Sequence, residues 1–119
     1  MTFNKDISYI NHILDAISDI EESLKNISRE KFEKNKDIKD ANIRRIEIIG
    51  EAVKNLSNNI KEKYNEIGWN KIIGTRDKMI HHYFGVNLDI IWDIIKISIP
   101  DLKIKILKIK KDISNNKTV

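Results

Sequence analysis

The stretch that decides the fold of this chain is residues 68–92, which read GWNKIIGTRDKMIHHYFGVNLDIIW. It holds both tryptophans, two of the three histidines and three of the four glycines. Apolar residues recur in it at the spacing of one helical face, which predicts an amphipathic helix; they are Trp69, Ile72, Ile73, Ile80 and Phe84. Gly85 is a natural C-terminal stop for this helix, and Asn87 is suited to cap the next one.

Two long amphipathic helices are expected before this stretch. In residues 3–27, apolar side chains recur at alternating three- and four-residue steps, interrupted at Glu21, with Thr2 or Asn4 as the cap. The second helix covers residues 37–57, and its seam runs through Ile38, Ala41, Arg45, Ile49, Ala52 and Leu56, widened by Ile46 and Val53. A glycine inside a helix costs about 1 kcal/mol relative to alanine, so we expect Gly50 to face a closely packed neighbour.

Shorter elements lie between the long helices. The charged segment 28–36 around Phe32 predicts a turn or a short helical shoulder, and residues 60–64 predict one helical turn. Arg45 falls on an apolar seam, which indicates a paired or interface position. His12 lies off its seam, so we expect a solvated side chain.

The C-terminal part is expected to be helical as well. Pro100 must kink or restart the helix that follows Asn87, and Ile91, Trp92, Ile95 and Ile99 should face inward. Residues 101–113 fit a strand or a helix by their apolar spacing, and we favour helix because a lone strand has nothing to pair with. The chain is therefore predicted to be an all-α, up-and-down bundle of four to five helices. It forms one domain over residues 1–114, with a flexible tail over 115–119.

Composition narrows the classes of function. The absence of cysteine excludes disulfides, thiolate metal sites and a cysteine nucleophile. No apolar run reaches transmembrane length and the N-terminus does not resemble a signal peptide, so the cytoplasm is the expected location. The net charge of +4 permits a polyanionic partner without proving one.

The central helix carries a combination of residues that suits chemistry on a phosphate. Arg76 supplies a permanent cation, His81 a group that titrates near neutral pH, and Tyr83 a phenol. Asp77 precedes His81 by one helical turn and can orient it. His81 lies roughly 140° around the helix from Arg76, so one straight helix does not bring all four side chains to a point. A second copy of the helix across a two-fold axis would close this gap, and the wide apolar stripes also predict a homodimer.

Arg and His together suffice for RNA cleavage by attack of the 2′-hydroxyl, which needs no metal ion. The sequence offers no tight carboxylate cluster for Mg²⁺ and no glycine-rich phosphate loop. The competing interpretation is structural: Arg, His and Tyr are common on the polar flank of an amphipathic helix, and residue types alone favour it by a modest margin.

The motif Arg76-Asp77-x-x-x-His81-x-Tyr83 resembles the signature of HEPN-domain ribonucleases. More narrowly, the chain resembles HepT-like toxins that are paired with minimal nucleotidyltransferase (MNT) antitoxins. Further segments fit that subfamily in order, so that the resemblance spans most of the chain: Ile46–Ala52, Trp69-x-x-Ile72-Ile73-Gly74, Tyr83–Val86, and Trp92 with Ile99-Pro100-x-Leu102.

The resemblance implies a HEPN-like helical bundle that dimerises so that the motifs of two protomers line one cleft. It implies a metal-independent endoribonuclease with Arg76 and His81 as the catalytic pair and no cofactor of its own. It also implies control by a cognate nucleotidyltransferase, which would transfer AMP from ATP onto Tyr83. One departure concerns the residue after Arg76, which is often Asn in the family and is Asp77 here.

Two other functions fit the same sequence. One is a non-catalytic helical adaptor that binds a nucleotidyltransferase or a nucleotide, and the other is a plain dimeric scaffold. An intact motif favours the ribonuclease over both.

Overall fold

The structure, a computed structural model, describes the backbone of residues 2–81 and 87–117 and the side chains of residues 5–75 and 87–115. The described residues fold into helices without any strand, which confirms the all-α class. In chain order the elements are α1 (Thr2–Ser23), α2 (Arg29–Lys34), α3 (Lys36–Asn55), α4 (Asn58–Lys63), α5 (Trp69–His81), α6 (Leu88–Asp93), the π-helical turn η2 (Ile94–Ser98) and α7 (Ile99–Lys117).

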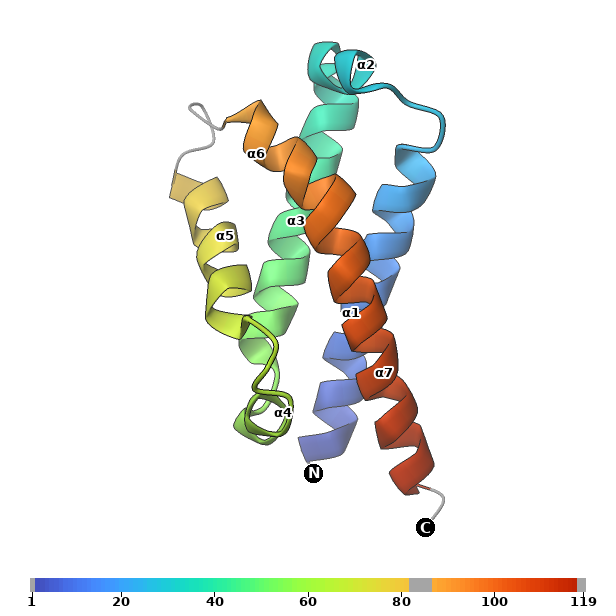
Figure 1. The fold of residues 1–119 in the computed structure, drawn as a ribbon, viewed down its shortest axis with the longest axis vertical. Coiled ribbons are helices and arrows are strands. Elements are labelled where there is room, and N and C mark those ends of the chain that lie inside the picture. The colour runs from blue at the N-terminus through green and yellow to red at the C-terminus, as the bar shows by residue number, and fades with distance from the viewer. Residues whose placement is uncertain (1, 82–86, 118–119) are drawn as a thin grey trace.

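The long helices form a bundle in which α3 occupies the middle position (Figure 1). α1 packs along one side of α3, and α5 packs along the other. α6, η2 and α7 follow one another as a single rod that starts near α5 and ends beside α1 (Figure 1). The first turn of α1 and the last turn of α7 lie at the same end of the bundle (Figure 1).

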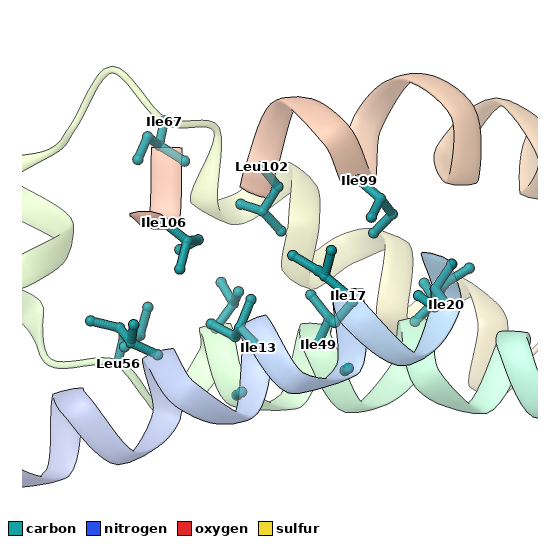
Figure 2. Packing of buried hydrophobic residues seen from close by; sticks show 14 of the residues in the cluster. Ile13, Ile17, Ile20, Ile49, Leu56, Ile67, Ile99, Leu102 and Ile106 are labelled. Carbon is teal, nitrogen blue, oxygen red and sulfur yellow. The ribbon is translucent and has the colours of Figure 1, made fainter. Parts of the chain in front are cut away.

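The core is built almost entirely from aliphatic side chains, most of them isoleucine. α1, α3 and the α6–α7 rod each present a buried stripe at three- and four-residue spacing, as the sequence predicted. Figure 2 shows Ile13 and Ile17 of α1 facing the same interior as Ile49 of α3 and Leu102 of α7. Full burial of one such side chain stabilises the fold by roughly 1.5–3 kcal/mol.

The first helix is shorter than predicted. α1 ends at Ser23, whereas the apolar periodicity suggested residue 27. Asn26 has a φ of 62°, a left-handed conformation that asparagine tolerates and that no helix interior accepts. Glu21, expected to interrupt the buried seam, is exposed, and its Oε2 lies 3.0 Å from Nζ of Lys103 on α7.

The seam of α3 also differs from the prediction. The apolar pattern put Arg45 on the buried seam, but Arg45 is only partly covered. Asn42 and Ile43, which the pattern left off the seam, are buried instead. The Asn42 amide donates to Ser23 Oγ at 3.0 Å and to the Ile38 carbonyl at 2.8 Å. Its Oδ1 accepts a hydrogen bond from the Arg45 guanidinium at 3.1 Å. Arg45 is therefore in a paired position, as its place on the seam indicated.

Pro100 restarts the helix through a widened turn. The Ile99 N–H bonds to the Ile94 carbonyl, five residues back, so η2 is π-helical immediately before the proline. The wider turn keeps Ile91, Ile95 and Ile99 on the buried side. Beyond Pro100 the helical interpretation of residues 101–113 is confirmed. α7 continues to Lys117, so residues 115–117 are helical rather than part of a tail, and 118–119 lie outside the described residues.

A buried carboxylate fixes the start of α1 to the turn between α3 and α4. Asp6 is 2% exposed, and its two oxygens accept hydrogen bonds from the Ser57 N–H at 2.8 Å and the Ser57 hydroxyl at 2.7 Å. Ser57 in turn caps α4, the helical turn predicted near residues 60–64. Hydrogen bonds to a charged group contribute about 1.5–3 kcal/mol each, so this contact is a substantial tie between distant segments.

A second tie joins the end of α4 to α7. The Tyr64 hydroxyl donates to Asp112 Oδ2 at 2.7 Å. Burial, and after it this hydrogen bond, raises the pKa of Tyr64 to about 12. An unfolded tyrosine titrates near pH 10. The protonated phenol therefore stabilises the fold fully below about pH 10, and that stabilisation is lost as the pH rises towards 12.

This shift predicts how stability depends on alkaline pH. The free energy of unfolding of the wild-type protein should fall more steeply between pH 10 and 12 than that of Tyr64→Phe, measured by urea unfolding at each pH. Tyr9→Phe, on α1, is the matched control and should retain the wild-type slope because Tyr64 is intact. Equal slopes for wild type and Tyr64→Phe would show that Tyr64 does not hold its proton more tightly in the fold.

Candidate functional site

Helix α5 carries three of the four residues that the sequence singled out. Arg76, Asp77 and His81 all belong to α5, which ends at His81. Their side chains lie outside the described residues, and Tyr83 lies outside them entirely, as does the predicted stop at Gly85. The backbone thus places the Arg, the Asp and the His on one helix, and the convergence of their side chains stays a prediction.

The N-terminal half of α5 is held firmly against the core. Trp69, its first residue, is buried, and its indole N–H donates to the Tyr64 carbonyl at 3.1 Å. Ile72 and Ile73 on the next turn also pack against the core. α5 lies along α3, in which Gly50 is buried, as expected for a glycine that faces a packed neighbour. Trp69, Ile72 and Ile73 of the predicted apolar face therefore attach the first turns of α5 to the bundle, whereas the side chains of Ile80 and Phe84 lie outside the described residues.

The segment after the signature motif is anchored by α6. The predicted cap is confirmed, because Asn87 Oδ1 accepts a hydrogen bond from the Asp89 N–H at 2.8 Å. Asp89 also forms an ion pair with Arg29 of α2. Trp92 stacks at an angle on the buried Phe32 of α2, with ring centroids 5.4 Å apart. The residues on both sides of 82–86 are thus attached to different parts of the bundle, α5 to α3 and α6 to α2.

Beside α5 lies a groove of about 450 Å³ that the sequence did not reveal. Its interior is formed by aliphatic side chains of α3, α5, η2 and α7, among them Ile49, Ile72 and Leu102. Lys71 and Thr75 of α5 line it as well. The spacing of apolar residues cannot predict such a groove, because the groove depends on how far apart two helices lie in the fold. We name this feature the α5–α7 groove.

Other candidate sites are weaker. His12 is exposed and meets Tyr9 edge-on at 6.3 Å between ring centroids, which confirms the expected surface histidine. Within residues 5–75 and 87–115, whose side chains the structure describes, no group of three or more His, Asp or Glu is placed to hold a metal ion. Nor does any described helix have the length and apolar character needed to cross a membrane.

Comparison with known proteins gives a consistent family. A protein of Methanocaldococcus jannaschii named a gamma-glutamylcyclotransferase and candidate RNase is 48% identical over 114 residues; these cover 95% of this chain and 51% of that protein, so the chain spans about half its length. A candidate RNase of Caldanaerobacter subterraneus is 46% identical, with 85% and 90% of the two chains covered. A "probable ribonuclease HepT" of Thermococcus cleftensis is 44% identical, with 87% and 94% covered. No solved structure gives a significant match.

The family model that matches this chain is described as ribonuclease HepT-like, and it covers residues 13–109. That range includes α5, the whole signature motif and most of the described core. The chain therefore belongs to the HepT-like ribonuclease family.

Proposed function

We propose that this protein is a metal-independent endoribonuclease that acts as a cytoplasmic toxin and is silenced by a cognate nucleotidyltransferase antitoxin. The observation that carries the proposal is the family match over residues 13–109 with Arg76, His81 and Tyr83 all present in the motif. The support from the fold is that Arg76 and His81 belong to one helix whose first turns are fixed to the core.

The proposed chemistry is transesterification within the RNA strand. His81 takes the proton from a 2′-hydroxyl, the 2′ oxygen bonds to the adjacent phosphorus, and the bond from phosphorus to the 5′ oxygen breaks. The leaving 5′ oxygen takes a proton from water, which yields a 2′,3′-cyclic phosphate and a 5′-hydroxyl end. Arg76 binds the phosphate and stabilises the negative charge that grows on its oxygens in the transition state.

Asp77 supports His81 in this scheme. The two positions are one turn apart on α5, a spacing at which side chains share a helical face. A carboxylate beside an imidazole favours its protonated form and raises its pKa. Asp77→Asn should therefore mainly move the pH at which cleavage is fastest, and it should change the maximal cleavage rate less.

The catalytic assignment predicts two inactive variants. His81→Ala and Arg76→Ala should each reduce RNA cleavage by at least about a hundredfold, the low end of what general acid–base catalysis contributes, while circular dichroism shows an unchanged helical fold. His12→Ala, an exposed histidine of α1, is the control and should cleave at the wild-type rate. Cleavage should persist in EDTA, and end-group analysis should find cyclic phosphate or 3′-phosphate ends.

Two results would reject this chemistry. One is full cleavage by His81→Ala, and the other is loss of wild-type cleavage in EDTA. A protein that binds the nucleotidyltransferase but never cleaves RNA would instead favour the adaptor function.

The proposed control acts on Tyr83. AMP on this phenol would place an anion and a purine two residues beyond His81, where they would compete with RNA for Arg76 and for space. The group transfer is balanced: the phenol oxygen bonds to the α-phosphorus of ATP, the phenol proton is released, and pyrophosphate leaves.

Intact-mass spectrometry tests this control. The wild-type protein incubated with the partner transferase and ATP should gain the mass of AMP and lose RNase activity, whereas Tyr83→Phe should gain no mass and stay active. Tyr9→Phe is the matched control and should be modified like the wild type. AMP found on the Tyr83→Phe variant, or on a residue outside 76–83, would show that another group is the acceptor.

A further inference from the structure

One helix accounts for the net positive charge of this protein. α7 contains six lysines and two aspartates, a balance of +4, and +4 is also the net charge of the whole chain. Removing these residues from the 22 basic and 18 acidic residues of the chain leaves 16 of each. α7 is therefore the part of the fold best suited to a polyanionic partner.

The C-terminal half of α7 presents lysines to solvent. Its buried stripe consists of Leu102, Ile106, Ile109 and Ile113. Lys108 and Lys111 are exposed and lie on the opposite side of the helix, where they follow the exposed Ile104 at four- and three-residue steps. These three residues form the outer stripe of α7, which faces away from the bundle.

Contacts on both edges of α7 keep the outer stripe facing outwards. On one edge, Lys103 Nζ lies 3.0 Å from Glu21 Oε2 of α1. On the other edge, Asp112 Oδ2 accepts the hydrogen bond from the Tyr64 hydroxyl at 2.7 Å. Because both edges are held, α7 cannot rotate about its own axis without breaking one of these contacts and exposing its buried stripe.

The two lysines of the outer stripe lack a counter-charge on the protein. Their neighbours on α7 have one, since Lys103 pairs with Glu21 and Lys105 pairs with Asp101 at 2.7 Å. Within residues 5–75 and 87–115, no carboxylate forms an ion pair with Lys108 or Lys111. Like charges one turn apart on a helix repel each other, so an anion bound to the outer stripe relieves this repulsion.

The acidic side of the molecule limits the direction in which a bound polyanion can run. α1 packs beside α7 and contains five acidic residues and one lysine, with Asp15, Asp19 and Glu22 exposed. On the side of α5, Lys105 and Lys71 line the α5–α7 groove. Carboxylates repel phosphates and lysines attract them, so a polyanion on the outer stripe continues towards α5 rather than over α1.

We propose that Lys108 and Lys111 bind phosphates of the RNA strand at a distance from the cleavage site on α5. The chain belongs to a ribonuclease family, so RNA is the polyanion that this protein meets. Lysine binds a phosphate as a point charge and does not read the base. This second contact rests on the proposed ribonuclease function and adds to it a preference for long strands.

The separation of the two contacts sets the length of RNA that uses both. The C-terminal half of α7 lies across the bundle from α5 (Figure 1), and the molecule is 50 Å long. At about 3.4 Å per stacked nucleotide, roughly 15 nucleotides span this length. A three-nucleotide RNA covers only about 10 Å, so it occupies the site on α5 without reaching the outer stripe.

Salt-dependent binding tests this contact apart from cleavage. A twenty-nucleotide RNA with 2′-O-methyl groups throughout has no 2′-hydroxyl to attack the phosphate, and fluorescence anisotropy gives its dissociation constant at each salt concentration. Lys108→Gln/Lys111→Gln should raise this constant at least about tenfold at 0.1 M salt. It should also reduce the slope of log K against log salt by about 1.4, because each phosphate contact to a single strand contributes about 0.7. Lys31→Gln/Lys54→Gln changes two exposed lysines of α2 and α3 and has the same net charge, so this control should bind like the wild type.

Further variants of the outer stripe separate phosphate binding from other contacts. Lys108→Arg/Lys111→Arg keeps both charges and should keep the wild-type affinity, and Ile104→Ser should leave the affinity unchanged as well. Equal losses in the two glutamine double variants, or a loss of RNA affinity on Ile104→Ser, overturn the assignment. Wild-type affinity in Lys108→Gln/Lys111→Gln also overturns it and leaves the stripe to an acidic protein partner.

Cleavage of unmodified RNA separates this contact from the ribonuclease proposal. Lys108→Gln/Lys111→Gln should lower kcat/KM at least about tenfold for a twenty-nucleotide RNA, through KM, and should leave kcat/KM for a three-nucleotide RNA at the wild-type value. Equal losses on both lengths would contradict a contact away from the cleavage site. A wild-type protein that cuts neither RNA, but whose binding depends on the two lysines, would contradict the ribonuclease proposal alone.

Discussion

The packing of α5 against α3 is the contact on which the candidate site depends. Trp69 sets the start of α5 by entering the core and donating its indole N–H to the Tyr64 carbonyl. Tyr64 is held in turn by Asp112 of α7, so the first turn of α5 is tied to two other helices. Beyond that turn α5 has α3 as its one extensively packed neighbour among the described residues. Because α5 is packed mainly on α3, the side of α5 opposite α3 is available for binding.

The direction of the α6–η2–α7 rod determines how much of the side of α5 that faces away from α3 is exposed. Pro100 cannot donate a backbone hydrogen bond, and the π-helical turn before it keeps the isoleucine stripe of the rod buried. Past the turn, α7 packs along α1 rather than along α5, and Lys103 of α7 forms an ion pair with Glu21 of α1 at the exposed edge of that contact. The α5–α7 groove and the exposed Ile97 follow from this divergence. Pro100 thus helps to shape the α5–α7 groove, whose lining includes its neighbours Ile99 and Asp101.

Features set by local sequence were predictable, and features set by distant contacts were not. The helices, the Asn87 cap and the inward stripe through Ile91 follow from periodicity and capping chemistry, which act over a few residues. The buried Asp6 escaped prediction because its partner, Ser57, is far away in the chain. Asn42 is a polar residue inside an apolar seam, which periodicity cannot place. The residue types alone made Arg76 and His81 candidates for phosphate chemistry but fitted an ordinary polar flank slightly better, and the resemblance to a family was needed to favour catalysis.

We propose further that the protein is a homodimer in which two copies of α5 line one catalytic cleft, as the family resemblance implies, with the Arg of each site coming from one protomer and the His from the other. Mixing the separately inactive Arg76→Ala and His81→Ala proteins, after unfolding and joint refolding, tests it most directly. Random pairing makes about half of the dimers mixed, and each mixed dimer has one intact site, so RNA cleavage should return to about a quarter of the wild-type rate. Mixed dimers that form, as seen by native mass spectrometry, and yet cleave no RNA would contradict the shared cleft.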